Sequence, residues 1–258
     1  MQNNVRLKVE DLHLRFGDLV ALDGVGLEAY DREILAIIGP NGAGKTALLN
    51  CINGFYKPWE GKITFDGSKI IHLPPYKIAK LGISRTFQNL ALYSGASTLE
   101  NILTGRHFQT NENFFLQMTW FGPTRKEEIK QRRVVEEIMD FLEIQHIRYT
   151  KVGSLPYGLR KRVELARALA LEPKLLLVDE PMTGMNHEEK EDMARYLIDI
   201  NQLKKIPIII IEHDMGLVMD VADRVAVLDF GRKIKEGTPE MIRSDSKVIQ
   251  SYLGKIED

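Results

Sequence analysis

The sequence predicts an α/β protein in which a mostly parallel sheet carries helices on both faces. Short apolar runs that are rich in leucine or β-branched residues, and that end at turn or charged residues, are typical of buried strands. Segments with the apolar spacing of helices separate these runs, and such alternation indicates a parallel sheet. The predicted strands are residues 34–38, 175–178, 208–211 and 225–228, and the predicted helices are 45–52, 159–171 and 187–203.

Two parts of the chain depart from this alternation. Residues 1–30 and 62–71 alternate apolar and polar side chains, which predicts half-exposed antiparallel strands. Strand signals fade between about residues 90 and 155, where residues 124–142 form a charged segment with an apolar helical stripe. We therefore expect an N-terminal antiparallel β subdomain and an inserted α-helical subdomain.

These patterns give one domain, residues 1–258, rather than two independent ones. We place its core at about 1–88 and 159–235, the helical subdomain at about 89–158 and a helical tail at about 236–258. An irregular stretch, residues 107–123, precedes the charged helix and carries four aromatic residues: Phe114, Phe115, Trp120 and Phe121.

Composition narrows the class of protein. The chain has 258 residues, with 35 Lys+Arg against 36 Asp+Glu and a net charge of -1, so we expect no nucleic-acid partner. Its 44% hydrophobic residues are enough for a sizeable core, which argues against disorder. The single cysteine, Cys51, excludes an internal disulfide and a cysteine-based zinc cluster.

The N-terminal residues are polar and mixed in charge, without the apolar core of a signal peptide. No apolar run approaches the 18 residues that a membrane span needs. We therefore expect a soluble cytoplasmic protein that reaches a membrane only through a partner.

A phosphate-binding loop follows the first predicted strand of the parallel sheet. Its residues match G-x-x-x-x-G-K-[ST] between a strand and a helix, the context in which this motif is credible. They are Gly39, Pro40, Asn41, Gly42, Ala43, Gly44, Lys45 and Thr46, with Ala47 next in the helix. Backbone N–H groups and the helix terminus would face the phosphates, Lys45 would reach the β- and γ-phosphates, and Thr46 would bind Mg²⁺.

Two acids, Asp179 and Glu180, end the strand at 175–178. Ligands bind at the carboxyl ends of parallel strands, so these acids should face the phosphate loop. Asp179 would hold Mg²⁺, and Glu180 would polarise the water that attacks the γ-phosphate. Without a phosphate loop in the same chain, two solvated acids at a strand end would be the simpler interpretation.

Further motifs separate the classes of phosphate-loop protein. No N-K-x-D follows the loop, so a guanine-specific pocket has no evident source. Arg85-Thr86-Phe87-Gln88, residues 154–158 (SLPYG) and Ile211-Glu212-His213-Asp214 occur in order with the two motifs above. Over essentially its whole length the chain resembles the ATP-binding-cassette (ABC) ATPases. The resemblance implies a P-loop NTPase (RecA-like) core, ATP and Mg²⁺ as cofactors, and ATP hydrolysis.

The resemblance also implies residue roles. Gln88 would contact Mg²⁺ and the attacking water, although its residue type fits a surface amide equally well. His213 would hydrogen-bond the γ-phosphate, whereas a lone histidine there is more often a polar strand end. Phe16 would stack on adenine or would belong to the core. Glu180, His213, Gln88 and Lys45 form the predicted catalytic set.

In this family the signature segment acts in trans, closing on ATP held by a second subunit. Leu155, Tyr157 and Gly158 would make these contacts through backbone N–H groups and a helix dipole. The usual pattern is L-S-G-G-Q, and Pro156 stands where the serine hydroxyl is expected. Asn186 likewise replaces the aspartate that often ends the next loop. Both departures concern trans contacts, and neither affects Lys45, Asp179 or Glu180.

The variant motifs resemble the longer of the two ATPases in branched-chain amino-acid importers. Such systems imply a second ATPase subunit, membrane permeases and an external solute-binding protein, with this subunit at the cytoplasmic face of a bacterial or archaeal membrane. In isolation with ATP the subunit would form a homodimer. The aromatic residues at 107–123 would contact the permeases or pack locally. Two alternatives stay open: another solute (urea, an aromatic acid or lipopolysaccharide export), or a non-transport ABC ATPase.

Overall fold

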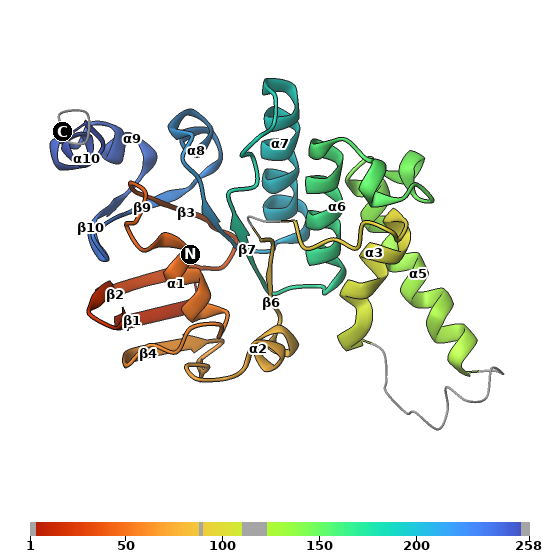
Figure 1. Cartoon of the computed structure of the whole chain (residues 1–258), viewed down its shortest axis with the longest axis horizontal. Coiled ribbons are helices and arrows are strands. Elements are labelled where there is room, and N and C mark those ends of the chain that lie inside the picture. Colours follow the sequence, from red (N-terminus) through yellow and green to blue (C-terminus); the bar gives the residue numbers. More distant parts are fainter. Residues whose placement is uncertain (1–3, 88–89, 110–122, 254–258) are drawn as a thin grey trace.

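Six strands form the sheet at the centre of the molecule (Figure 1). The computed structural model describes residues 4–87, 90–109 and 123–253. The strands of this sheet are β3 (Ile34–Ile38), β6 (Ile83–Arg85), β7 (Leu175–Asp179), β8 (Ile208–Ile211), β9 (Arg224–Asp229) and β10 (Arg232–Gly237). Their order is β10-β9-β3-β8-β7-β6, and all neighbours are parallel except β9 and β10. The prediction of a mostly parallel sheet is confirmed.

A second sheet of four strands is antiparallel and contains the N-terminal residues. Its strands are β1 (Val5–Phe16), β2 (Leu19–Tyr30), β4 (Glu60–Phe65) and β5 (Ser68–Lys69), in the order β2-β1-β4-β5. The alternation of apolar and polar residues matches these strands, because one face of the sheet is buried and the other is partly exposed. The segment predicted as strand at 62–71 is broken by a turn at Asp66 and Gly67.

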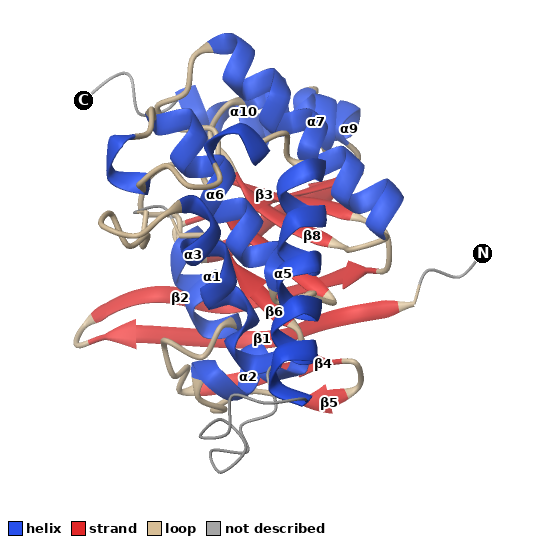
Figure 2. Cartoon of the chain, turned by 90° about the vertical axis from the view of Figure 1, so that its right-hand side faces the viewer, coloured by secondary structure: helices blue, strands red, loops and turns tan. Residues whose placement is uncertain are grey.

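Helices cover both faces of the central sheet (Figures 1 and 2). They are α1 (Lys45–Ile52), α2 (Pro75–Leu81), α3 (Thr98–Leu103), α5 (Pro123–Phe141), α6 (Tyr157–Ala170), α7 (His187–Lys204), α8 (Met215–Val221), α9 (Pro239–Arg243) and α10 (Ser246–Leu253). Short 3-10 helices span Thr104–Gln109, Gln145–Ile147 and Val152–Ser154. Helix α6 begins two residues before the predicted start. Pro156 directly precedes it with φ -53°, a value that the proline ring fixes and that leads into a helix.

The two sheets share one body because the central strands contribute alternate side chains to two apolar clusters. Ile38, Val178 and Ile210 face a cluster that includes α3, α5, α6 and α7. Ile37 and Ile211 face the other cluster, which contains the antiparallel sheet and α1. Each central strand is therefore buried on both faces, as a covered parallel sheet requires.

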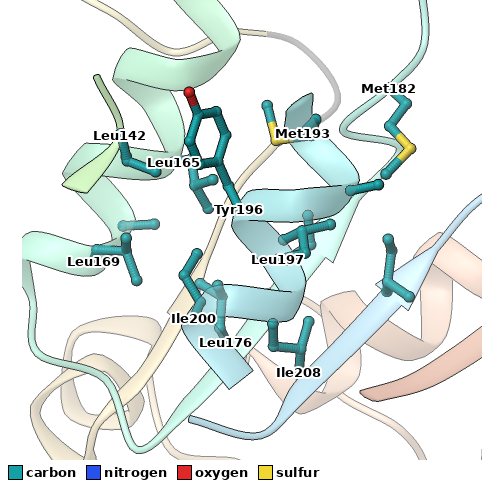
Figure 3. Packing of buried hydrophobic residues seen from close by; sticks show 14 of the residues in the cluster. Leu142, Leu165, Leu169, Leu176, Met182, Met193, Tyr196, Leu197, Ile200 and Ile208 are labelled. Atoms are coloured by element: carbon teal, nitrogen blue, oxygen red, sulfur yellow. The ribbon is translucent and has the colours of Figure 1, made fainter. Parts of the chain in front are cut away.

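Tyr196 of α7 shows how the helical side of this core is fixed (Figure 3). Its side chain is fully buried among Leu142, Leu165 and Leu169. Its hydroxyl accepts a hydrogen bond from Arg162 at 3.0 Å and donates one to Glu143 at 3.0 Å. A buried tyrosine thus keeps both polar partners at the edge of an apolar cluster.

Helix α6 contacts α3 and α5 on one side and β6 on the other. It therefore joins the expected helical subdomain to the sheet, and the division at residues 88 and 158 stays a prediction. Within the described ranges, no helix is both long and apolar enough to span a bilayer. The aromatic residues Phe114, Phe115, Trp120 and Phe121 lie outside the described residues.

Candidate functional site

The phosphate loop joins β3 to α1 and depends on glycine at both of its ends. Gly39 has φ 147°, and a Cβ atom there would overlap the carbonyl oxygen of Leu228. Gly44 has φ 97°, and a Cβ atom would lie 2.6 Å from the carbonyl oxygen of Ala21. Any other residue would force the loop away from these strands. The tight curve of Gly39–Thr46 thus follows from close approach of backbone to backbone.

Lys45 opens α1 and points back over the loop. Its Nζ atom donates to the carbonyl oxygens of Gly39 at 2.7 Å and Pro40 at 2.9 Å, and the side chain is almost fully buried. A buried ammonium group held at the loop opening is suited to bind anionic oxygens, since charge-assisted hydrogen bonds are stronger than neutral ones. Thr46 and Ala47 follow it in the first turn of α1.

The acidic pair lies at the end of β7, as predicted. Asp179 is its last residue and is 1% exposed. Its Oδ2 atom accepts a hydrogen bond from Arg85 Nη2 at 2.7 Å, while Oδ1 has no partner within the described part of the chain. A buried carboxylate oxygen without a donor is costly unless a cation or water satisfies it. Among the described residues, this oxygen lacks the donor or cation that would satisfy it.

Glu180 adopts a left-handed backbone conformation with φ 48°. Such a φ is uncommon in a residue with a Cβ atom, and strained backbone of this kind clusters at functional sites. The Glu180 amide donates to the carbonyl oxygen of Ile211 at 2.9 Å, so the turn is fixed against the end of β8. The sequence motif alone did not indicate this conformation.

The turn brings Glu180 against His213, which follows β8. The distance from His213 Nε2 to Glu180 Oε1 is 2.6 Å. Strand order β3-β8-β7 places the residues after β3, β8 and β7 next to one another at one edge of the sheet. The phosphate loop, His213 and Glu180 each follow one of these strands. A carboxylate hydrogen-bonded to an imidazole is a suitable group to accept a proton from water.

Sequence reasoning missed the part played by Glu212, a buried residue next to His213. Its carboxylate accepts from the backbone amides of Met182 at 2.9 Å and His213 at 3.1 Å. Burial raises the pKa of the Glu212 carboxyl, against the opposing effect of these two hydrogen bonds. Glu212 thus fixes His213 relative to the loop after β7. Its place in the run IIIIEHD was the available signal.

Phe16 is the last residue of β1 and is 47% exposed, so the alternative that it belongs to the core is wrong. Its ring meets the ring of Tyr56 edge-on, with centroids 5.0 Å apart. The exposed ring is available for stacking, and the adenine contact stays a prediction. Gln88 lies outside the described residues.

The signature segment begins α6 and contacts the loop after β7 of the same chain. A Cβ atom at Gly184 would lie 3.1 Å from the ring of Tyr157, and one at Gly158 would overlap the Glu189 carboxylate. Leu155 is buried, while Tyr157 is 41% exposed. Figure 1 places α6 and α1 on opposite sides of β7, so this segment does not meet the phosphate loop of its own chain.

Asn186 caps α7. Its side chain accepts from the Glu189 amide at 2.9 Å, and the Glu189 carboxylate accepts from the Asn186 amide at 3.1 Å. This reciprocal capping box satisfies two backbone donors at the start of the helix. The side-chain oxygen of Asn186, a residue of the loop associated with trans contacts, is therefore already engaged within the chain.

Comparison with known proteins agrees with this geometry. Residues 22–183 match the family model described as ABC transporter. The chain is 36% identical to the high-affinity branched-chain amino acid transport ATP-binding protein BraF of Pseudomonas aeruginosa, covering 96% of this chain and 98% of that one. Identity to LivG of Escherichia coli K12, described in the same words, is 37% over 96% and 98% of the two chains.

The fold is also similar to that of solved cassettes. The ADP conformation of an ATP-binding cassette of an ABC transporter superposes with a TM-score of 0.85. That protein is 32% identical, and the match covers 97% of this chain and 99% of the other. The likeness thus extends over both sheets and the helices between them.

Proposed function

The chain belongs to the ABC transporter family, and on that premise we propose that it is the ATP-hydrolysing subunit of an importer of branched-chain amino acids. The observation that carries the enzymatic part is the 2.6 Å contact between Glu180 and His213. This pair lies at the sheet edge where the phosphate loop also begins. The relatives named for branched-chain amino acid transport support the solute.

Binding of ATP depends on the loop between β3 and α1. Its backbone N–H groups and the N-terminus of α1 face the phosphates, and Lys45 exchanges its bonds to Gly39 and Pro40 for phosphate oxygens. Phe16 stacks on the adenine ring. These interactions hold the γ-phosphate near the ends of β7 and β8.

Hydrolysis needs a group that accepts a proton from the attacking water. Glu180 is that base, since its carboxylate lies against His213 where β7 and β8 end. His213 Nε2 holds the carboxylate in place before ATP binds, and its single N–H donor then turns to the γ-phosphate. Gln88, predicted to contact the water, follows Phe87 after β6.

The residues present fit a magnesium ion. The Oδ1 atom of Asp179, which has no hydrogen-bond partner among the described residues, and the hydroxyl of Thr46 are oxygen ligands of the kind that Mg²⁺ prefers, and the phosphates would complete the shell. When bound, Mg²⁺ neutralises charge that develops on the phosphate oxygens. Within the described residues, no group of three or more His, Cys, Asp or Glu side chains forms a larger metal site.

Assembly with other chains completes this function. The exposed Tyr157 and the start of α6 would close on ATP bound to a second ATPase subunit, and integral-membrane permeases would hold the pair at the cytoplasmic face. An external solute-binding protein would deliver the amino acid. Association with the membrane is therefore peripheral.

The solute is tested by uptake of radiolabelled leucine in a strain that lacks this gene. We expect uptake to be lost and to be restored by the wild-type chain but not by Lys45→Ala. Uptake of urea, uptake of an aromatic acid and export of lipopolysaccharide are measured in the same strain as the competing activities. Loss of one of these with normal leucine uptake would contradict the assignment, and co-purification with ribosomes or DNA instead of permeases would contradict transport itself.

A further inference from the structure

Arg85, the last residue of β6, makes a buried ion pair with Asp179. The Arg85 and Asp179 side chains are 3% and 1% exposed, and Nη2 lies 2.7 Å from Oδ2. Strands β6 and β7 are parallel neighbours, with Arg85 opposite Leu177. The arginine therefore reaches forward along the sheet edge to the carboxylate two residues later on β7.

The guanidinium group has further anchors besides this carboxylate. Its Nη1 atom donates to Asn50 Oδ1 of α1 at 2.6 Å, and its Cζ atom lies over the Phe87 ring, 5.2 Å from the ring centroid. The Phe87 amide in turn donates to the Glu164 carboxylate of α6 at 3.0 Å. Contacts from several elements thus fix the orientation of Arg85, because its forked donors reach two groups at once.

The two oxygens of Asp179 consequently have different surroundings. Oδ2 is occupied by Arg85, whereas Oδ1 is buried and has no hydrogen-bond partner within the described ranges. The hydrogen bond from Arg85 to Oδ2 restricts rotation of the carboxylate and so keeps Oδ1 in one position. Outer-shell partners of this kind typically change metal affinity about 10- to 100-fold.

We propose that Arg85 is the positioning residue of the metal site, holding Asp179 through Oδ2 so that Oδ1 faces the divalent cation bound with the nucleotide. The inference rests on the proposed function, since it takes ATP with Mg²⁺ as the ligand. Orientation and charge make opposite predictions here. The arginine is itself a cation, so charge alone would oppose Mg²⁺ and its removal would strengthen metal binding.

The test measures binding of a fluorescent, non-hydrolysable ATP analogue in Mg²⁺ and in EDTA. The dissociation constant in EDTA divided by the dissociation constant in Mg²⁺ reports how strongly the protein binds the metal of the complex. In Arg85→Met we expect this ratio to fall about tenfold, with affinity in EDTA changed by no more than about twofold. An unchanged or increased ratio would overturn the proposal. Failure of the wild type to bind the analogue in either condition would instead contradict the proposed function.

Arg85→Lys keeps the buried charge but has a single donor group, so it carries the test if Arg85→Met does not fold. We expect it to lower the ratio about threefold, and a wild-type ratio would overturn the positioning role. Arg106→Lys is the matched control. Arg106 is also buried, donates to the Ala170 carbonyl and pairs with Glu172, but it has no contact with Asp179. Its ratio should equal that of the wild type.

Discussion

The Oε1 atom of Glu180 lies 2.6 Å from the Nε2 atom of His213. The two residues are 33 positions apart in the chain and meet because they follow neighbouring parallel strands, β7 and β8. The left-handed backbone of Glu180 and the buried carboxylate of Glu212 fix the two partners from either side. Removal of either member should therefore reduce catalysis more than it reduces nucleotide binding.

Replacing His213 by alanine tests the second member of this pair. We expect ATP hydrolysis to fall about 100-fold, because Glu180 loses the group that orients it, while nucleotide affinity changes little. Steady-state phosphate release measures the rate. His187→Ala is the control, since His187 is an exposed residue at the start of α7. A wild-type rate in His213→Ala would remove His213 from the mechanism.

Lys45→Ala tests the phosphate loop. The ammonium group offers charge-assisted hydrogen bonds to phosphate, so we expect nucleotide affinity to fall about 10- to 100-fold by titration calorimetry. Lys62→Ala, a half-exposed lysine of β4 that pairs with Glu10, should bind nucleotide normally. Equal affinities in the two variants would refute the role of Lys45.

Cys51 provides a pH-dependent test of the packing of α1. Burial raises the pKa of its thiol from 9.0 to about 12. At pH 8 the reactive thiolate is then about one part in ten thousand, against about a tenth for the unfolded chain. Alkylation by iodoacetamide, followed by mass spectrometry, should be at least about 100-fold slower in the native protein than in urea.

The sign of the linked effect on stability follows from the same shift. The folded pKa lies above the unfolded value, so the folded protein keeps its thiol proton longer. The contribution of Cys51 to stability is present below pH 9 and declines between about pH 9 and 12. If Cys51 is alkylated at pH 8 as fast in the native protein as in urea, α1 opens readily and the prediction of a protected thiol is contradicted.

Gly158→Ala tests the contact between the signature segment and α7. The new Cβ atom would displace the Glu189 carboxylate and break its capping box with Asn186, at a cost of about 1 kcal/mol. Thermal unfolding should show a Tm lower by about 2–4 °C. In Glu189→Ala the box is already lost, so adding Gly158→Ala should cost little more. Additive effects would contradict this account.

Much of the site was predictable because its chemistry depends on short local patterns. The phosphate loop and the acids at 179 and 180 each follow an apolar strand, and strand-end position predicts their meeting. The helix was predicted at 187–203 with its start correct, and the capping role of Asn186 was also available, since Asn-x-x-Glu before an apolar stripe is a capping-box pattern. Asn186 was instead interpreted as a residue of the contacts with a second subunit, because the corresponding residue of the family has that role.

Other features required the three-dimensional arrangement. The motif that contains Arg85 does not indicate which residue the arginine contacts. Its ion pair with Asp179 follows only from the adjacency of β6 and β7. The φ of 48° at Glu180 is set by its hydrogen bond to Ile211 on another strand. Such long-range contacts have no signature in the residues around them.

The most direct test of the account compares the wild type with Glu180→Gln, each purified with its membrane partners. Nucleotide binding and ATP hydrolysis are measured on the same samples. We expect Glu180→Gln to bind ATP within about threefold of wild type, to hydrolyse it at least about 100-fold more slowly and to accumulate the ATP-bound ATPase dimer. Near-wild-type hydrolysis by Glu180→Gln would contradict the assignment of Glu180 as the catalytic base.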